Sequence, residues 1–219
     1  MENKQIKLEP FIYKYDPEHL YFMKRQIWES INNVSVYSKL SQLEHEQYKA
    51  HINKPKRVLD LGCGLGRAAI YLNHMLNDPE VHFILADANE DSQIVTGKYA
   101  SNNQEKYNKL DLTASFCKLN GLTNFETFDI YRNDWNQLKD IDLVISHCSV
   151  GMHYPVKDAL PNLLKVTTPN CVMVFGTRNR MVYSKNSFKN LFETVIFLPQ
   201  NYIQSFPQQD WLILKNKKN

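Results

Sequence analysis

The amino-acid sequence predicts an α/β fold in which a mostly parallel sheet of seven strands carries helices on both faces and follows an N-terminal helical extension. From residue 55 onward, strand-like apolar segments alternate with segments of helical periodicity. A glycine-rich turn follows the first of these strands, and two strand-like segments end the chain. With 219 residues, 43% hydrophobic and 22% charged, the chain has the size and composition of one ordinary globular domain.

The first 54 residues are expected to form a helical extension or lid. Asp16, Pro17 and Glu18 form a helix-start signal, because aspartate caps, proline suits the first turn and glutamate complements the helix dipole. Apolar residues then follow helical spacing as far as Ile31, and a second helix is expected over residues 36–51. On this second helix, Glu44 and Tyr48 are candidate contacts at the edge of a ligand.

Residues 55–219 are expected to form the main domain. Helices are predicted over residues 67–76, within residues 91–119 around a polar loop at 101–106, and between the fourth and fifth strands. The predicted strands span residues 57–61, 81–87, 125–129, 141–146, 171–176, 192–198 and 211–215.

Composition excludes several classes of protein. Lys and Arg number 26 against 23 Asp and Glu, a net charge of +3, whereas a dedicated nucleic-acid binder more often has a strong basic excess. The four cysteines form no CxxC pair, so we expect no metal. Because the sequence has no apolar secretory core and no run long enough to cross a membrane, we expect a cytoplasmic protein without membrane contact.

The most informative segment is the turn after the first strand, where Asp60 precedes glycines at positions 62, 64 and 66. Glycines let the backbone turn sharply and approach a ligand, and the following helix offers free N–H groups at its N-terminus. The G-x-G-x-G spacing differs from the G-x-G-x-x-G of dinucleotide sites. A carboxylate at Asp60 repels a pyrophosphate, which favours a cationic ligand without phosphate.

The run D-L-G-C-G-L-G at residues 60–66 resembles motif I of class I S-adenosylmethionine-dependent methyltransferases, and the likeness extends over residues 57–176. It implies a Rossmann-like class I methyltransferase fold, with S-adenosylmethionine as cofactor and residues 55–219 as the domain that binds it. The resemblance assigns the ribose hydroxyls to Asp87, the adenine amino group to Asp129 and the face of the ring to Ile130. The full cofactor set that we expect is Asp60, Gly62, Cys63, Gly64, Gly66, Asp87, Ala88, Asp129, Ile130, Ser146 and His147.

The resemblance implies that the loop after the fourth strand, residues 147–155, is the reaction centre. A hydroxyl acceptor needs a base to take its proton, and histidine suits this role near neutral pH. We favour His153 over His147 as that base, because His153 lies beyond Gly151 and can reach into the substrate space. Tyr154 adds an aromatic wall, so the candidate catalytic residues are His153, His147 and Tyr154.

Three functions stay open at this point. The first is methyl transfer to a small polar acceptor, such as a hydroxyl of a sugar or other metabolite, since residues 149–154 are similar to bacterial methyltransferases that act on sugars. The second is a methyltransferase for RNA or nucleotides, because the same residues somewhat resemble the loop of cap guanine-N7 methyltransferases. The third is a non-catalytic binding protein on the same fold. A homodimer also remains open.

Overall fold

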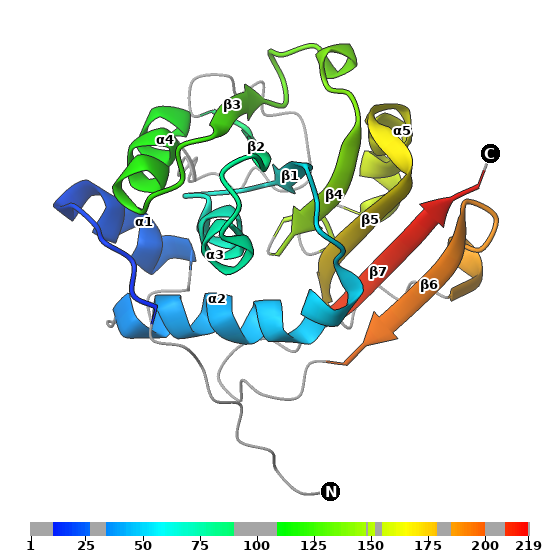
Figure 1. Cartoon of the computed structure of the whole chain (residues 1–219), viewed down its shortest axis with the longest axis horizontal. Coiled ribbons are helices and arrows are strands. Elements are labelled where there is room, and N and C mark those ends of the chain that lie inside the picture. The colour runs from blue at the N-terminus through cyan, green and yellow to red at the C-terminus, as the bar shows by residue number, and fades with distance from the viewer. Residues whose placement is uncertain are drawn as a thin grey trace, which may run out of the picture.

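The computed structural model describes residues 11–26, 34–89, 109–147, 149–151, 155–178, 185–199 and 209–218. They form one seven-stranded sheet in the order β3-β2-β1-β4-β5-β7-β6 (Figure 1). The strands are β1 (Arg57–Leu61), β2 (His82–Asp87), β3 (Phe125–Asp129), β4 (Ile141–Ser146), β5 (Thr167–Arg178), β6 (Phe192–Leu198) and β7 (Gln209–Lys217). The α-helices are α1 (Pro17–Gln26), α2 (Val34–Tyr48), α3 (Arg67–Leu76), α4 (Leu110–Leu119) and α5 (Val156–Val166).

The sheet is parallel from β3 through β5, and β7 runs antiparallel to both of its neighbours. The chain passes from β1 to β2 and β3 on one side, and then returns to β4 and β5 on the other. This reversal between β1 and β4 is the switch point at which open α/β sheets bind ligands, beyond the carboxyl ends of their strands. We call this side the carboxyl edge, and the opposite side the amino edge.

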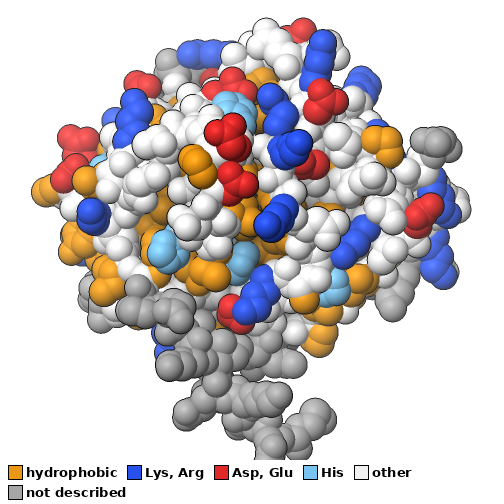
Figure 2. Space-filling view, in the orientation of Figure 1, with side chains coloured by type: hydrophobic (Ala, Val, Ile, Leu, Met, Phe, Trp, Pro, Cys, Tyr) orange, Lys and Arg blue, Asp and Glu red, His pale blue; other side chains and the backbone are white. Residues whose placement is uncertain are grey.

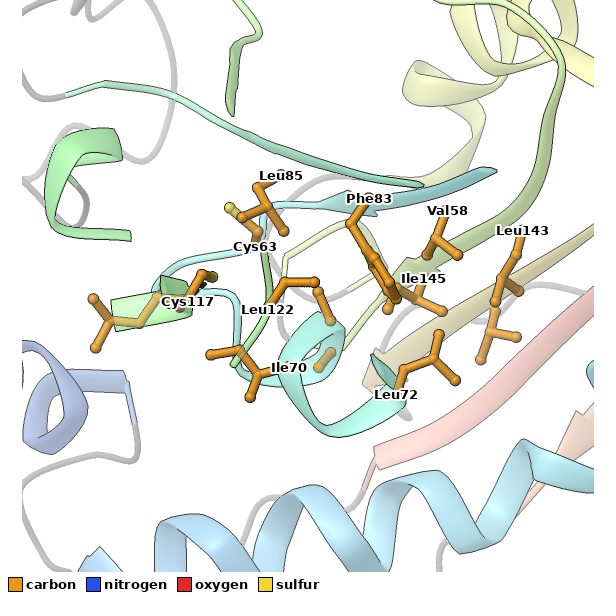
Figure 3. Packing of buried hydrophobic residues seen from close by; sticks show 14 of the residues in the cluster. Val58, Cys63, Ile70, Leu72, Phe83, Leu85, Cys117, Leu122, Leu143 and Ile145 are labelled. Carbon is orange, nitrogen blue, oxygen red and sulfur yellow. Dashed lines mark hydrogen bonds between the residues drawn. The ribbon is translucent and has the colours of Figure 1, made fainter. Parts of the chain in front are cut away.

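One face of the sheet is covered by α1, α2, α3 and α4. Its core contains Val58 of β1, Phe83 of β2, and Leu143 and Ile145 of β4, together with apolar residues of these helices. Figure 3 shows these strand side chains beside Ile70 and Leu72 of α3. Tyr13, Tyr37 and Tyr48 belong to the same core, so the N-terminal segment packs against the main sheet.

The opposite face is covered by α5 and by the short 3-10 turns η2 (Trp135–Gln137) and η3 (Lys185–Ser187). Its core takes the alternate residues of the same strands, such as Leu59 of β1 and Val144 of β4. Both faces of the central strands are therefore buried, which explains why these strands are almost continuously apolar.

The predicted fold is confirmed, with differences at the ends of elements. The helix expected over residues 36–51 begins at Val34 and ends as a 3-10 turn, η1 (Lys49–His51). β5 and β7 are longer than predicted, because they pair with each other over seven residues and extend together. The predicted loop at 101–106 lies within residues 90–108, which are outside the described part. No helix in the described part of the chain is long and apolar enough to cross a membrane.

Candidate cofactor and acceptor site

The glycine turn requires glycine for two separate reasons. Gly62, Gly64 and Gly66 all have positive φ angles, of 71°, 54° and 77°, which favour residues without a Cβ. Gly62 also meets the loop after β4, since a Cβ built on it would lie 2.0 Å from the Cβ of Ser149. A Cβ on Gly66 would lie 2.6 Å from Cys117 Sγ on α4. The turn is therefore fixed by its neighbours as well as by its own backbone.

Asp87, at the end of β2, holds the glycine turn in place. Its Oδ2 accepts a hydrogen bond of 2.8 Å from the Gly64 backbone N–H, and its Oδ1 accepts one of 2.8 Å from Ala88. Asp129 is its register partner on β3, and the Ile130 N–H donates to the Asp87 carbonyl at 3.1 Å. The sheet thus brings together the residues that were assigned to the ribose and to the adenine.

Asp129 carries a buried acceptor atom that the described residues leave unsatisfied. Its Oδ1 accepts from the Tyr131 N–H at 3.0 Å, whereas Oδ2 has no hydrogen-bond partner in the described structure and lies 3.9 Å from Arg132 Nε. The side chain is only 8% exposed. Because such an atom is costly to leave unpaired, it fits a ligand that donates a hydrogen bond, such as an exocyclic amino group.

Asp60 lies beneath the glycine turn and caps α3. Gly66 is the N-cap residue of this helix and has no side chain that could accept a hydrogen bond from the first turn. Asp60 Oδ2 accepts the Ala69 N–H at 3.2 Å instead. Burial raises the pKa of Asp60 to about 7, although the Ala69 N–H and the Arg67 guanidinium favour the ionised form. This carboxyl group therefore titrates near neutral pH, where a bound cation would favour its ionised form.

Two further residues that the sequence assigned to this edge, Cys63 and Ser146, are also buried. Cys63 donates to the Gly64 carbonyl at 3.5 Å, and burial raises the pKa of its thiol well above the ordinary value, so it is not a thiolate. Ser146 Oγ, at the end of β4, accepts the Val150 N–H at 3.0 Å and so bends the loop that follows.

His147 is buried, with a partner at each ring nitrogen. Its Nδ1 lies 2.8 Å from Glu44 Oε2, and its Nε2 lies 2.7 Å from the Tyr48 hydroxyl. Burial lowers the pKa of His147 below its ordinary value, even though Glu44 acts in the opposite direction. The imidazole is therefore neutral near pH 7, and both of its described polar contacts are to helix α2.

Glu44 also forms an ion pair with Arg67, the first residue of α3. Both carboxylate oxygens accept from the guanidinium, Oε2 from Nη1 and Oε1 from Nη2, the latter at 3.2 Å. Burial on its own would raise the pKa of Glu44, but Arg67 and His147 together lower it to about 2. The carboxylate is consequently ionised at neutral pH.

The remaining candidates for catalysis, His153 and Tyr154, lie outside the described residues. The loop that leads to them is anchored at Gly151, whose φ is 94° and whose Cβ, if present, would lie 2.7 Å from the Gly176 carbonyl of β5. Within the described part of the chain, no group of three or more His, Cys, Asp or Glu side chains could hold a metal ion.

Sequence reasoning missed Arg67, Ser149 and Trp211 at this edge. Arg67 is joined to Glu44, Ser149 packs on Gly62, and the Trp211 ring lies 5.1 Å from that of His147. The only signal in the sequence was the position of Arg67 directly after the last glycine of the turn. The partners of these residues are too far away in sequence for a local pattern to show them.

A family model described as a methyltransferase domain matches residues 52–217. The chain belongs to this family, and it is an S-adenosylmethionine-dependent methyltransferase, as the glycine turn predicted. No curated protein matches the sequence.

Solved structures share the fold at low sequence identity. The plantazolicin methyltransferase BpumL, crystallised with a pentazolic desmethyl analogue and SAH, has a TM-score of 0.56 at 15% identity over 92% of each chain. A SAM-dependent methyltransferase from Aquifex aeolicus has a TM-score of 0.51 at 16% identity, over 92% of this chain and 98% of that one. A putative O-methyltransferase from Nostoc punctiforme PCC 73102 has a TM-score of 0.52 at 12% identity. The match covers 91% of this chain but only 61% of the Nostoc chain.

Proposed function

We propose that this methyltransferase acts on a small polar acceptor, a hydroxyl group of a sugar or other metabolite. The observation that carries the proposal is the pairing of Asp87 and Asp129 at neighbouring strand ends beside the glycine turn. In this proposal Asp87 and Ala88 bind the ribose, while Asp129 Oδ2 accepts the adenine amino group and Ile130 packs on the ring. Asp60 and the turn at Gly62, Cys63, Gly64 and Gly66 face the methionine end, and Ser146 and His147 border it at β4.

The chemistry is a displacement in which the cofactor, when bound, supplies a methyl group on a positively charged sulfur. The chain's own task is to align the acceptor and to remove its proton, and alignment alone accounts for much of such a rate enhancement. We assign the removal of this proton to His153, and we assign to Tyr154 the role of an aromatic wall. Both residues follow Gly151 in the sequence, which anchors the loop on β5. His147 is the second candidate, and it would have to exchange one of its α2 partners for the acceptor.

A small acceptor is also supported by the charge distribution. Figure 2 shows Lys and Arg side chains interspersed with Asp and Glu on the described part of one face, rather than gathered in a basic patch. The net charge is only +3. Nucleic-acid binding depends mainly on phosphate contacts by Lys and Arg, so this surface favours RNA less than a metabolite. The similar Nostoc chain is described as a putative O-methyltransferase, which agrees with a hydroxyl acceptor.

Asp87→Asn tests the cofactor site. We expect binding of S-adenosylhomocysteine, measured by isothermal titration calorimetry, to weaken at least tenfold, about 1.4 kcal/mol. The matched control is Asp142→Asn, because Asp142 also accepts two backbone N–H groups, from Lys56 and Arg57, but does so at the amino edge. Equal affinity in the two variants would refute the assignment of Asp87.

The acceptor is then sought with radiolabelled S-adenosylmethionine and a panel of sugars, other hydroxylated metabolites and RNA. Transfer to a hydroxylated metabolite that is lost in His153→Ala supports the proposal. Transfer to RNA that falls steeply with salt would replace it by the nucleic-acid alternative.

A further inference from the structure

Six polar side chains form a buried cluster between α2, α3 and the end of β4. Arg67 Nη1 donates to Ser41 Oγ at 3.2 Å. The Tyr13 hydroxyl donates to the Arg67 carbonyl at 2.7 Å and lies 2.8 Å from Ser41 Oγ. Together with the contacts of Glu44 described above, these bonds join the segment before α1 to α2, α3 and the end of β4. The members of this buried cluster are Tyr13, Ser41, Glu44, Tyr48, Arg67 and His147.

The protonation state of the cluster follows from its chemistry. An ionised carboxylate only accepts hydrogen bonds, so His147 Nδ1 must carry the proton in its contact with Glu44. A neutral imidazole then has its lone pair on Nε2, and the Tyr48 hydroxyl must donate to it. Burial raises the pKa of Tyr48 well above its ordinary value, which keeps this phenol protonated. The chain of donors therefore runs from Tyr48 through His147 to Glu44.

We infer that Glu44 is a positioning residue for the methyl-transfer site. It locks His147 in the Nδ1–H tautomer and attaches helix α2 to both sides of the pocket expected for the methionine end of the cofactor. This inference rests on the proposed function, since it takes the carboxyl edge to be the cofactor site.

The connections of Glu44 reach the glycine turn from both sides. Arg67 directly follows Gly66, so an ion pair to its guanidinium restrains the exit of the turn. His147 precedes the loop in which Ser149 packs on Gly62, so a hydrogen bond to its ring restrains the opposite side. One carboxylate thus restrains the two segments that flank the glycine turn.

Glu44→Gln distinguishes an effect on the tautomer of His147 from an effect on packing, because the two side chains have nearly the same shape. Arg67 can only donate, so it will take the single amide oxygen and leave the NH₂ group facing His147. Nδ1 must then become an acceptor, and the ring should change to the Nε2–H tautomer. ¹⁵N NMR of histidine-labelled protein distinguishes these tautomers, and a His147→Asn variant assigns the resonance.

We expect wild-type His147 to be the neutral Nδ1–H tautomer at pH 7.5, and Glu44→Gln to show Nε2–H together with about tenfold weaker binding of S-adenosylhomocysteine. Tyr48→Phe should keep the Nδ1–H tautomer, because the Glu44 carboxylate still accepts from Nδ1. The matched control is Glu126→Gln, because Glu126 lies beside His82 and Arg57, at 3.3 and 4.0 Å, in an exposed group at the amino edge. That variant should change neither the His147 signal nor the affinity.

A charged or Nε2–H His147 in the wild-type protein overturns the inference, even if Glu44→Gln proves unable to fold. A folded Glu44→Gln protein that shows only one of the two changes, or neither, also overturns it. Failure of the wild-type protein to bind S-adenosylhomocysteine would instead refute the proposed function, because the NMR result does not depend on ligand.

Discussion

The two edges of the sheet carry similar residues in very different surroundings. At the carboxyl edge, Glu44 is buried between Arg67 and His147, whereas at the amino edge Glu126 lies half exposed between Arg57 and His82. At the carboxyl edge burial lowers the pKa of His147, whereas Arg67 and His147 lower that of Glu44, because charges interact strongly where water is excluded. At the amino edge, water screens the same kinds of groups.

The same contrast holds for glycine. Gly62 at the carboxyl edge and Gly121 at the amino edge both have positive φ angles, of 71° and 83°. A Cβ on Gly62 would overlap Ser149, whereas a Cβ on Gly121 would meet no described atom within 4 Å. The comparison shows that the carboxyl edge is built to a fixed shape, while the amino edge only connects strands and helices.

The largest expected effect comes from Gly62→Ala compared with Gly121→Ala. Both variants place a Cβ in the left-handed region, which costs about 1–2 kcal/mol. Gly62→Ala must also displace Ser149, at a further cost of about 1–3 kcal/mol. We expect a much lower melting temperature and no measurable binding of S-adenosylhomocysteine for Gly62→Ala, but wild-type affinity for Gly121→Ala. Equal losses of stability in the two variants would remove the distinction between the edges.

A smaller effect is expected from Asp129→Asn, which should change stability and affinity in opposite directions. The substitution can keep the acceptor for the Tyr131 N–H and replaces Oδ2, which accepts no hydrogen bond from the described residues, by an NH₂ group. The substitution removes a buried charge whose Oδ2 has only a long contact, of 3.9 Å, to the half-exposed Arg132. The free energy of unfolding should therefore be unchanged or higher, since the charged oxygen loses its hydration on burial without a hydrogen bond from the described residues in return. Affinity for S-adenosylhomocysteine should fall about tenfold, because the new side-chain NH₂ group would face the adenine amino group, and both of these groups are donors.

The measurement is thermal unfolding together with calorimetric titration. Asp78→Asn serves as control, because Asp78 makes one local hydrogen bond, from the Glu80 N–H, in an exposed turn before β2. A fall in stability of Asp129→Asn without a fall in affinity would mean that Oδ2 serves the fold and not the nucleoside.

The two halves of the carboxyl edge also differ in what the sequence could predict. The glycine turn, Asp87 and Asp129 follow from local patterns, because each stands at the end of a strand whose apolar residues mark it. The contacts of His147 do not, since Glu44 and Tyr48 are 103 and 99 residues away along the chain. Sequence identified both α2 residues as candidate contacts at a ligand edge, but only packing of the N-terminal segment onto the sheet shows that they meet His147.

The same limit applies to charge states. Asp60 was recognised from its place before the glycine turn, yet its pKa depends on burial and on Arg67, Asp87 and Glu44, which approach from three different elements. Tertiary structure decides whether such a group is ionised, whereas local sequence decides only where it stands.

The smallest expected effect is a dependence of cofactor affinity on pH. The folded protein holds a proton on Asp60 up to about pH 7, whereas the unfolded chain releases it near the ordinary value of 3.8. This group therefore lowers stability as pH rises between those two values.

If the cationic cofactor lies beside Asp60, its binding favours the ionised form of the carboxyl group. Affinity for S-adenosylmethionine should therefore rise severalfold from pH 6 to pH 8, and binding below pH 7 should release a proton. Calorimetry in buffers of different ionisation enthalpy measures that proton. Asp60→Asn should bind with a flatter profile, because titration of the ligand itself is the same for both proteins. Identical profiles would place the positive charge of the cofactor away from Asp60, and the carboxyl group would then serve only to cap α3.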